Sequence, residues 1–120
     1  MEDKGDEEMK IRIFLSGGSG FIGSSLVNKL VNKRYEVTNY DIQPPKYVNG
    51  ANNILGDILD YPKLLRSMKE HDMVYHLAAR PYIPDGYLDP QGMVMTDMIG
   101  TLNMLLAAKK VGIKHFVHFS

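Results

Sequence analysis

The feature that most constrains the fold of this chain is a cluster of glycines placed directly after a short apolar run. Residues 11–15 are mostly apolar, and the next five residues read Ser-Gly-Gly-Ser-Gly. This order predicts a buried strand that ends in a tight turn. Apolar side chains then recur every three or four residues from about Gly20 to Asn32, which predicts an amphipathic helix. The sequence therefore predicts a strand, a glycine turn and a helix in immediate succession.

The rest of the chain continues this alternation. Further strands are expected at 37–40, 53–55, 73–77 and 115–119, and helices at 61–69 and from about 89 to 111, where Gly112 ends the helix. Strands that alternate with helices favour parallel βαβ units. We therefore expect an α/β fold over residues 11–120, with a Rossmann-type, doubly wound parallel sheet truncated after about five strands. Residues 1–10 are charged and are expected to form a disordered leader.

Composition narrows the classes of partner. The chain has 120 residues, enough for one domain, and its 14 Lys and Arg balance its 14 Asp and Glu. No strong field would draw it to nucleic acid or to an anionic membrane, and no apolar run approaches the roughly 18 residues of a membrane span. The absence of Cys excludes disulfides, thiolate metal sites and a Cys nucleophile, and fits a cytoplasmic location.

The glycine turn has the spacing of a phosphate-binding loop. Gly17, Gly20 and Gly23 form a G-x-x-G-x-x-G pattern at the junction of the predicted strand and helix. The N-H groups and the dipole at a helix N-terminus attract a phosphate. A side chain in the turn would obstruct a pyrophosphate, and one at Gly23 would hold the helix away from the strand. The pattern therefore predicts a dinucleotide-binding loop.

An acid about twenty residues further on indicates which dinucleotide. Asp41 ends the second predicted strand, where its carboxylate can accept hydrogen bonds from both hydroxyls of an adenosine ribose. A 2'-phosphate at about 4 Å would be repelled by about 1 to 4 kcal/mol, depending on the effective dielectric. The sequence predicts NAD rather than NADP.

Two other nucleotide-binding classes have similar glycine loops. The residues from Gly18 to Gly23 resemble part of a P-loop, but Ser24 stands where that motif needs a lysine. A kinase or ATPase is therefore disfavoured. A methyltransferase that uses S-adenosylmethionine remains open as an alternative from a different class.

Five motifs in a fixed order carry a resemblance to a known family. They are Ser16-Gly-Gly-Ser-Gly-Phe-Ile-Gly23, Gly56-Asp57-Ile58, His76-Leu-Ala-Ala79, Gly100-Thr101-Leu-Asn103 and Phe116-Val-His-Phe-Ser120. With these motifs the chain resembles an extended short-chain dehydrogenase/reductase. More narrowly, it resembles the N-terminal part of the NAD-dependent nucleotide-sugar epimerases and dehydratases, from about Lys10 to the last residue.

The resemblance implies a role for each matching residue. The three glycines and the backbone of Phe21 and Ile22 would hold the pyrophosphate of NAD, and Asp57 and Ile58 would border the adenine. Three residues at the end of the fourth strand would lie under the middle of the cofactor, namely Leu77, Ala78 and Ala79. It also implies a nucleotide-sugar substrate for the full-length protein and a homodimer formed through the long helix.

The family's catalytic residues cannot be assigned on this chain. The family's Tyr-x-x-x-Lys pair has no match, because none of the seven tyrosines is followed four residues later by a lysine. The chain ends at Ser120, the first residue of the family's Ser-Ser motif, and Asp97 stands where the family commonly has Asn. We therefore expect the 120 residues alone to be catalytically inactive and to be the cofactor-binding part of an enzyme. A catalytically silent dinucleotide-binding module is the alternative.

The four histidines and the methionines of the long helix do not by themselves predict a site. No two histidines have the i, i+4 spacing of a helical metal site, so His71, His76, His115 and His118 are expected to be packing or surface residues, and no metal site is predicted. Met93, Met95, Met98 and Met104 recur along the predicted long helix. Core packing is the default interpretation of such a stripe.

Overall fold

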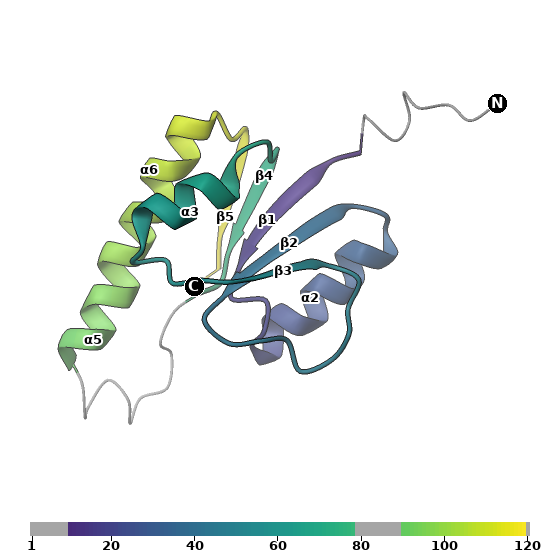
Figure 1. Cartoon of the computed structure of the whole chain (residues 1–120), viewed down its shortest axis with the longest axis horizontal. Helices are drawn as coiled ribbons and strands as arrows, with labels where there is room; N and C mark the ends of the chain where they lie inside the picture. The colour runs from purple at the N-terminus through teal and green to yellow at the C-terminus, as the bar shows by residue number, and fades with distance from the viewer. Residues whose placement is uncertain (1–9, 79–89, 120) are drawn as a thin grey trace.

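The computed structural model describes residues 10–78 and 90–119, which form a single five-stranded parallel sheet with helices on both faces (Figure 1). The strands are β1 (Arg12–Ser16), β2 (Glu36–Asp41), β3 (Asn52–Leu55), β4 (Met73–His76) and β5 (His115–His118). The helices are α2 (Phe21–Asn32), α3 (Tyr61–Met68), α5 (Pro90–Val94), η1 (Met95–Gly100) and α6 (Thr101–Val111). Residues 1–9 of the predicted leader and Ala79 lie outside the described residues.

The strand order is β3-β2-β1-β4-β5, and every neighbouring pair is parallel. The chain moves outward from β1 to β2 and β3, and then crosses back to β4 on the other side of β1. The point where the direction reverses lies between β1 and β4, and ligands of such sheets bind there, at the carboxyl ends of the strands. This order confirms the predicted α/β, Rossmann-type fold.

Each face of the sheet has its own apolar core. On one face, α2 covers a cluster of five buried side chains, which are Ile13, Leu15, Val27, Leu30 and Val37. On the other face, α3 and α6 cover a larger cluster that includes Phe14, Tyr40, Leu64, Val74 and Met104. Successive β1 side chains enter opposite clusters because a strand alternates its side chains between the two faces. Helices therefore cover both faces, as a doubly wound sheet requires (Figure 1).

The long helix differs from its prediction in its middle turns. The chain is helical from Pro90 to Val111, but Met95–Gly100 is a π-helix rather than α-helix. Gly100 packs against Ile58, where an added Cβ would lie 2.3 Å from Ile58 Cδ1. Helical periodicity in the sequence does not distinguish these two hydrogen-bonding patterns over so short a segment. Gly112 ends the helix in the left-handed conformation, at φ 88°, as predicted.

The connection from β2 to β3 contains no helix, and none was predicted there. Residues 42–51 form this connection and contain Pro44, Pro45 and Gly50. Proline lacks an N-H donor, and two in succession disfavour a helix.

Across the described residues, no helix is long and apolar enough to cross a membrane.

Candidate functional site

The glycine turn lies at the carboxyl end of β1, between the ends of β2 and β4. The Gly17 N-H donates to the Tyr40 carbonyl on β2 at 3.1 Å. On the β4 side, a Cβ added to Gly17 would lie 2.7 Å from the Ala78 nitrogen, and Gly17 has a φ of +87°. A side chain at Gly17 is therefore excluded both by its backbone conformation and by the neighbouring strand end.

The other glycines of the turn have different reasons to lack a side chain. A Cβ at Gly23 would lie 2.1 Å from the Gly17 carbonyl oxygen, so the first turn of α2 packs directly on the loop. A Cβ at Gly20 would meet only the Gly17 oxygen, at 3.6 Å, which is an ordinary contact. The protein itself leaves room beside Gly20, and this position is exposed. The space there is available to a ligand.

The first turn of α2 is open to an anion. Gly20 is the N-cap and supplies no side-chain cap, and no acidic residue stands in the first turn. The first N-H groups of a helix have no partner within the helix, and they carry the positive end of its dipole. Phe21 and Ile22 in this turn are 90% and 66% exposed, so the backbone that was predicted to hold a pyrophosphate is accessible.

Asp41 lies beside the glycine turn, as the sequence predicted. Its Oδ2 accepts from the Ser19 N-H and its Oδ1 from the Gln43 N-H, both at 2.9 Å. The Ser19 hydroxyl donates to the Gln43 carbonyl at 2.8 Å, which ties the turn to the residues after β2. Each carboxylate oxygen has two lone pairs, so each retains the capacity to accept one more hydrogen bond.

A buried asparagine also holds the turn, and it was not predicted from the sequence. Asn39 on β2 is 1% exposed, and its Oδ1 accepts from the Gly18 N-H at 2.8 Å. Its Nδ2 donates to the Ser19 hydroxyl at 3.2 Å and to Asn53 Oδ1 at 3.1 Å. A Cβ at Gly18 would lie 2.3 Å from Asn39 Oδ1, so this glycine is also required. The signal available in the sequence was a polar residue within a strand whose neighbours are buried.

The predicted adenine residues lie in the loop after β3, and they differ in exposure. Asp57 is exposed, and its Oδ1 accepts from the Leu59 N-H at 2.9 Å. Ile58 is only 4% exposed and packs in the core, so its side chain has almost no surface for a ligand. The role of both at the adenine stays a prediction.

Two side chains from other elements hold this loop in place. The Tyr40 hydroxyl donates to the Asp57 carbonyl at 2.9 Å, and Asn103 Nδ2 on α6 donates to the Ile58 carbonyl at 3.0 Å. Burial, with the charges of Asp60 and Asp57, raises the pKa of the Tyr40 hydroxyl to about 12. The hydroxyl therefore keeps its proton and can donate it to the loop at neutral pH.

The end of β4 meets the glycine turn through Ser16. The Ser16 hydroxyl oxygen accepts from the N-H groups of Leu77 and Ala78, each at 3.2 Å. These two residues are half-buried at the reversal point of the sheet, and the family resemblance implies that they lie under the middle of the cofactor. The neighbouring His76 is fully buried, as expected of a packing residue, whereas His115 and His118 are exposed.

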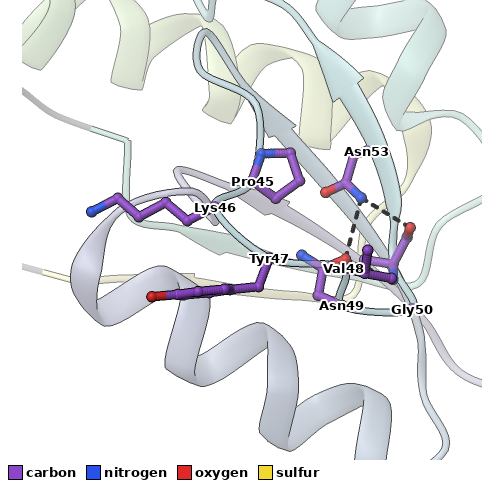
Figure 2. Close-up of a pocket in the computed structure, with 8 residues that line it drawn as sticks. Pro45, Lys46, Tyr47, Val48, Asn49, Gly50 and Asn53 are labelled. Atoms are coloured by element: carbon purple, nitrogen blue, oxygen red, sulfur yellow. Dashed lines mark hydrogen bonds between the residues drawn. The ribbon is translucent and has the colours of Figure 1, made fainter.

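A shallow hollow of about 490 Å³ lies in the connection from β2 to β3. It is lined by residues 45–51 and Asn53, and none of the predicted site residues lines it. Figure 2 shows Asn53 joined to Asn49, while Lys46 extends away from Asn53. No group of three or more His, Cys, Asp or Glu side chains within the described ranges could hold a metal ion.

The strand order, the glycine turn against the α2 N-terminus and the acid at the end of β2 define a Rossmann-type nucleotide-binding domain. Residues 13–120 match the NAD dependent epimerase/dehydratase family, and the chain belongs to this family. The family assignment agrees with the predicted cofactor, NAD. It removes the methyltransferase alternative.

Known proteins of this family resemble the chain in sequence and in structure. UDP-glucuronic acid decarboxylase 5 of Arabidopsis thaliana is 40% identical over 115 residues, which are 88% of this chain and 32% of that protein. UDP-glucose 4-epimerase of Thermotoga maritima, solved with UDP-glucose, has a TM-score of 0.83 and 31% identity, over 90% of this chain and 37% of that one. MoeE5, solved with UDP-glucuronic acid and NAD, has a TM-score of 0.82 and 26% identity, over 89% of this chain and 36% of that one. The chain thus spans between about a quarter and a third of the length of the curated relatives it matches.

Proposed function

We propose that these 120 residues form the NAD-binding portion of an enzyme that acts on a nucleotide sugar by transient hydride transfer to NAD. The observation that carries this proposal is the glycine turn, which is held between Asp41 on one side and the Leu77–Ala78 strand end on the other. Family membership supports the cofactor, because the family is NAD-dependent.

The residues present fit the cofactor. The turn contacts its own protein closely at Gly17 and Gly23 but leaves open space beside Gly20, and the uncapped N-terminus of α2 suits a pyrophosphate. The free lone pairs of Asp41 would accept the two ribose hydroxyls. Leu77 and Ala78 would support the middle of the cofactor. When bound, NAD supplies a reversible hydride acceptor.

Calorimetric titration with NAD, NADP and ADP-ribose tests the site. NAD and ADP-ribose should bind alike, and NADP should bind more weakly because Asp41 repels its 2'-phosphate. Asp41→Asn keeps the size of the side chain and removes its charge, so the preference for NAD over NADP should shrink. Glu36→Gln is the matched control, because Glu36 is an exposed acid at the opposite end of the same strand. Equal binding of NAD and NADP by the unchanged chain would contradict the assignment of Asp41.

The substrate and the reaction are proposed for the full-length enzyme, because the chain spans only about a quarter to a third of the length of its relatives. The relatives named above act on UDP-glucuronic acid or UDP-glucose according to their names, which supports a UDP-sugar as substrate. The test is turnover of UDP-glucuronic acid and of UDP-glucose by the full-length protein, with and without added NAD. Turnover that requires NAD would support the proposal that the full-length protein is an NAD-dependent enzyme. NAD binding with no turnover of any nucleotide sugar would instead support a silent dinucleotide-binding module.

The long helix supports a homodimer as part of the proposal. Four of its apolar side chains follow a spacing of three, four and three residues and are 47–65% exposed, namely Met95, Met98, Leu102 and Leu105. Leu102 and Leu105 lie in α6 and have the three-residue spacing found in the seam of an α-helix that packs against another helix. Met95 and Met98 lie in the preceding π-helix and extend the exposed apolar surface. Met104, by contrast, is buried in the core of the chain.

Sedimentation velocity over a range of concentrations tests the homodimer. Leu102→Glu should shift a dimer toward monomer, because it places a charge in the seam. Lys29→Glu, at an exposed position on α2 and on the opposite face of the sheet, is the control and should leave the dimer intact. A monomer at all concentrations would contradict the homodimer.

A cytoplasmic location also remains a prediction, which cell fractionation would test.

A further inference from the structure

Three side chains form a chain of hydrogen bonds behind the proposed cofactor site. The Ser16 hydroxyl on β1 lies 2.6 Å from His76 Nδ1 on β4, and His76 Nε2 lies 2.8 Å from the Thr101 hydroxyl at the start of α6. Ser16 and His76 are both fully buried. The chain therefore links two strands and a helix at the reversal point of the sheet.

Counting donors and acceptors places the protons in this chain. A serine hydroxyl has one proton to donate and two lone pairs. The Ala78 N-H donates to the Ser16 hydroxyl oxygen at 3.2 Å. The Leu77 N-H makes a bifurcated hydrogen bond to the same hydroxyl oxygen at 3.2 Å and to the Ser16 carbonyl oxygen at 2.9 Å. With its lone pairs used in this way, the hydroxyl must donate its proton to His76 Nδ1. The proton of a neutral His76 is then on Nε2 and is donated to Thr101.

The surroundings of His76 favour this neutral form. Burial is the main cause that lowers its pKa, to about 4, and the neighbouring His118 lowers it further. Asp97 on the long helix opposes this shift. The His118 ring stacks on His76 with centroids 4.9 Å apart, and Phe116 packs on it at 6.2 Å. Both aromatic contacts come from β5.

The Ser16 hydroxyl is the group through which His76 reaches the site. It holds the Ala78 N-H, which is also the atom that would meet a Cβ on Gly17 at 2.7 Å. The strand end and the glycine turn therefore pack against each other at this point. We propose that His76 is a positioning residue for the cofactor site: with its proton on Nε2, it orients the Ser16 hydroxyl, which in turn holds Leu77 and Ala78 against the glycine turn. This inference rests on the proposed function, because Leu77 and Ala78 are among the residues assigned to NAD.

His71 provides an internal comparison, because its contacts require the opposite proton position. Its Nδ1 lies 3.0 Å from two carbonyl oxygens, those of Met68 and Lys69, so Nδ1 must carry a proton. Its Nε2 lies 2.8 Å from the Thr38 hydroxyl, which can donate to it. His71 is also buried, and burial lowers its pKa. The two buried histidines are thus expected as different tautomers in one chain.

Nitrogen-15 NMR of the imidazole rings at pH 7 tests the proton assignment without any ligand. We expect His76 as the neutral Nε2-H tautomer and His71 as the neutral Nδ1-H tautomer. A protonated His76, or a His76 with its proton on Nδ1, would overturn the inference. This result does not depend on whether the chain binds NAD, so it is distinct from a failure of the proposed function.

Two variants separate positioning from packing. His76→Asn keeps an acceptor near the position of Nδ1, so it can still receive the Ser16 proton, and it should bind ADP-ribose within about threefold of the unchanged chain. His76→Gln instead places its amide near the position of Nε2 and leaves Ser16 without its acceptor, and it should bind about tenfold more weakly. Both variants lose the ring that stacks on His118. Equal loss of affinity in the two variants, at comparable stability, would overturn the positioning role and leave only a packing role. No binding by the unchanged chain would instead refute the proposed function.

Discussion

The burial of His76 has a consequence for the pH dependence of stability. Its pKa is about 4 in the folded chain, against 6.5 for a solvated histidine in the unfolded chain. Above pH 6.5 the residue is neutral in both states and has no effect on the free energy of unfolding. Between pH 6.5 and 4 the unfolded chain binds a proton that the folded chain does not bind. Acid therefore favours unfolding over this range.

The size of the effect follows from the two pKa values. A pKa difference of one unit corresponds to about 1.4 kcal/mol, so the full loss is about 3 kcal/mol once the pH falls below the folded pKa. Between pH 7 and pH 5 the loss is about 2 kcal/mol, because the unfolded state is almost fully protonated at pH 5 while the folded state is not. For a domain whose total stability is about 5 to 15 kcal/mol, this loss is measurable.

Urea unfolding followed by circular dichroism at pH 7 and pH 5 measures this loss. The His76→Asn variant has no imidazole to titrate, so its stability should fall by about 2 kcal/mol less than that of the unchanged chain between the two pH values. The variant's own loss of packing at pH 7 cancels in this comparison. His115→Asn, at an exposed position on β5, is the control for removing an imidazole from the surface. If the unchanged chain and His76→Asn lost the same stability, His76 would not be a neutral buried group and the reasoning would be refuted.

Three further predictions concern the site. Gly17 and Gly112 have nearly the same φ, 87° and 88°, but a Cβ at Gly112 meets nothing within 4 Å. Gly112→Ala should therefore lower the free energy of unfolding by about 1 kcal/mol through backbone strain alone. Gly17→Ala should lower it by about 2 to 4 kcal/mol, because the added methyl group also clashes with Ala78. Equal losses for the two variants in urea unfolding would show that the clash with Ala78 does not occur. Asn39→Leu removes the acceptor of the Gly18 N-H and should weaken ADP-ribose binding about tenfold in calorimetry, whereas unchanged affinity would show that the turn does not need this bond. The 120-residue chain should show no turnover of UDP-glucuronic acid by chromatography of the products, because it has no Tyr-x-x-x-Lys pair, and measurable turnover would contradict this expectation.

The local elements could be predicted because their signals lie within a few residues of each other. The strand, turn and helix from residue 11 to Asn32 were expected from apolar spacing and glycine placement, and the structure has β1 and α2 there. Asp41 was also found from the sequence, because the distance from the turn to the end of the next strand is set by the length of the intervening helix. The boundaries differ by one or two residues, as at β4, which was expected to reach Leu77 and ends at His76.

The structure was needed for everything that depends on which strands and helices become neighbours. His76 was expected only as a packing or surface residue. Its hydrogen bond to Ser16 joins residues 60 positions apart, and it exists because β1 and β4 are adjacent and in register at these two residues. The burial of the Ile58 side chain against Gly100, the last residue of η1, could not be predicted either, because it depends on where the long helix packs. The assignment of Ile58 to the adenine stays a prediction.

What the sequence determined by itself was the strand-turn-helix unit, its acid and the order of the elements, because backbone hydrogen bonding and side-chain periodicity are local properties. Only the tertiary structure decided how the turn is held. Asn39 accepts from the Gly18 N-H, and Ser16 accepts from the Ala78 N-H, because the parallel pairing of β1 with β2 and β4 brings the carboxyl ends of these strands to one edge of the sheet. A buried polar group must find its partners in this environment, and the identity of those partners depends on strand register, which residue spacing along the chain does not specify.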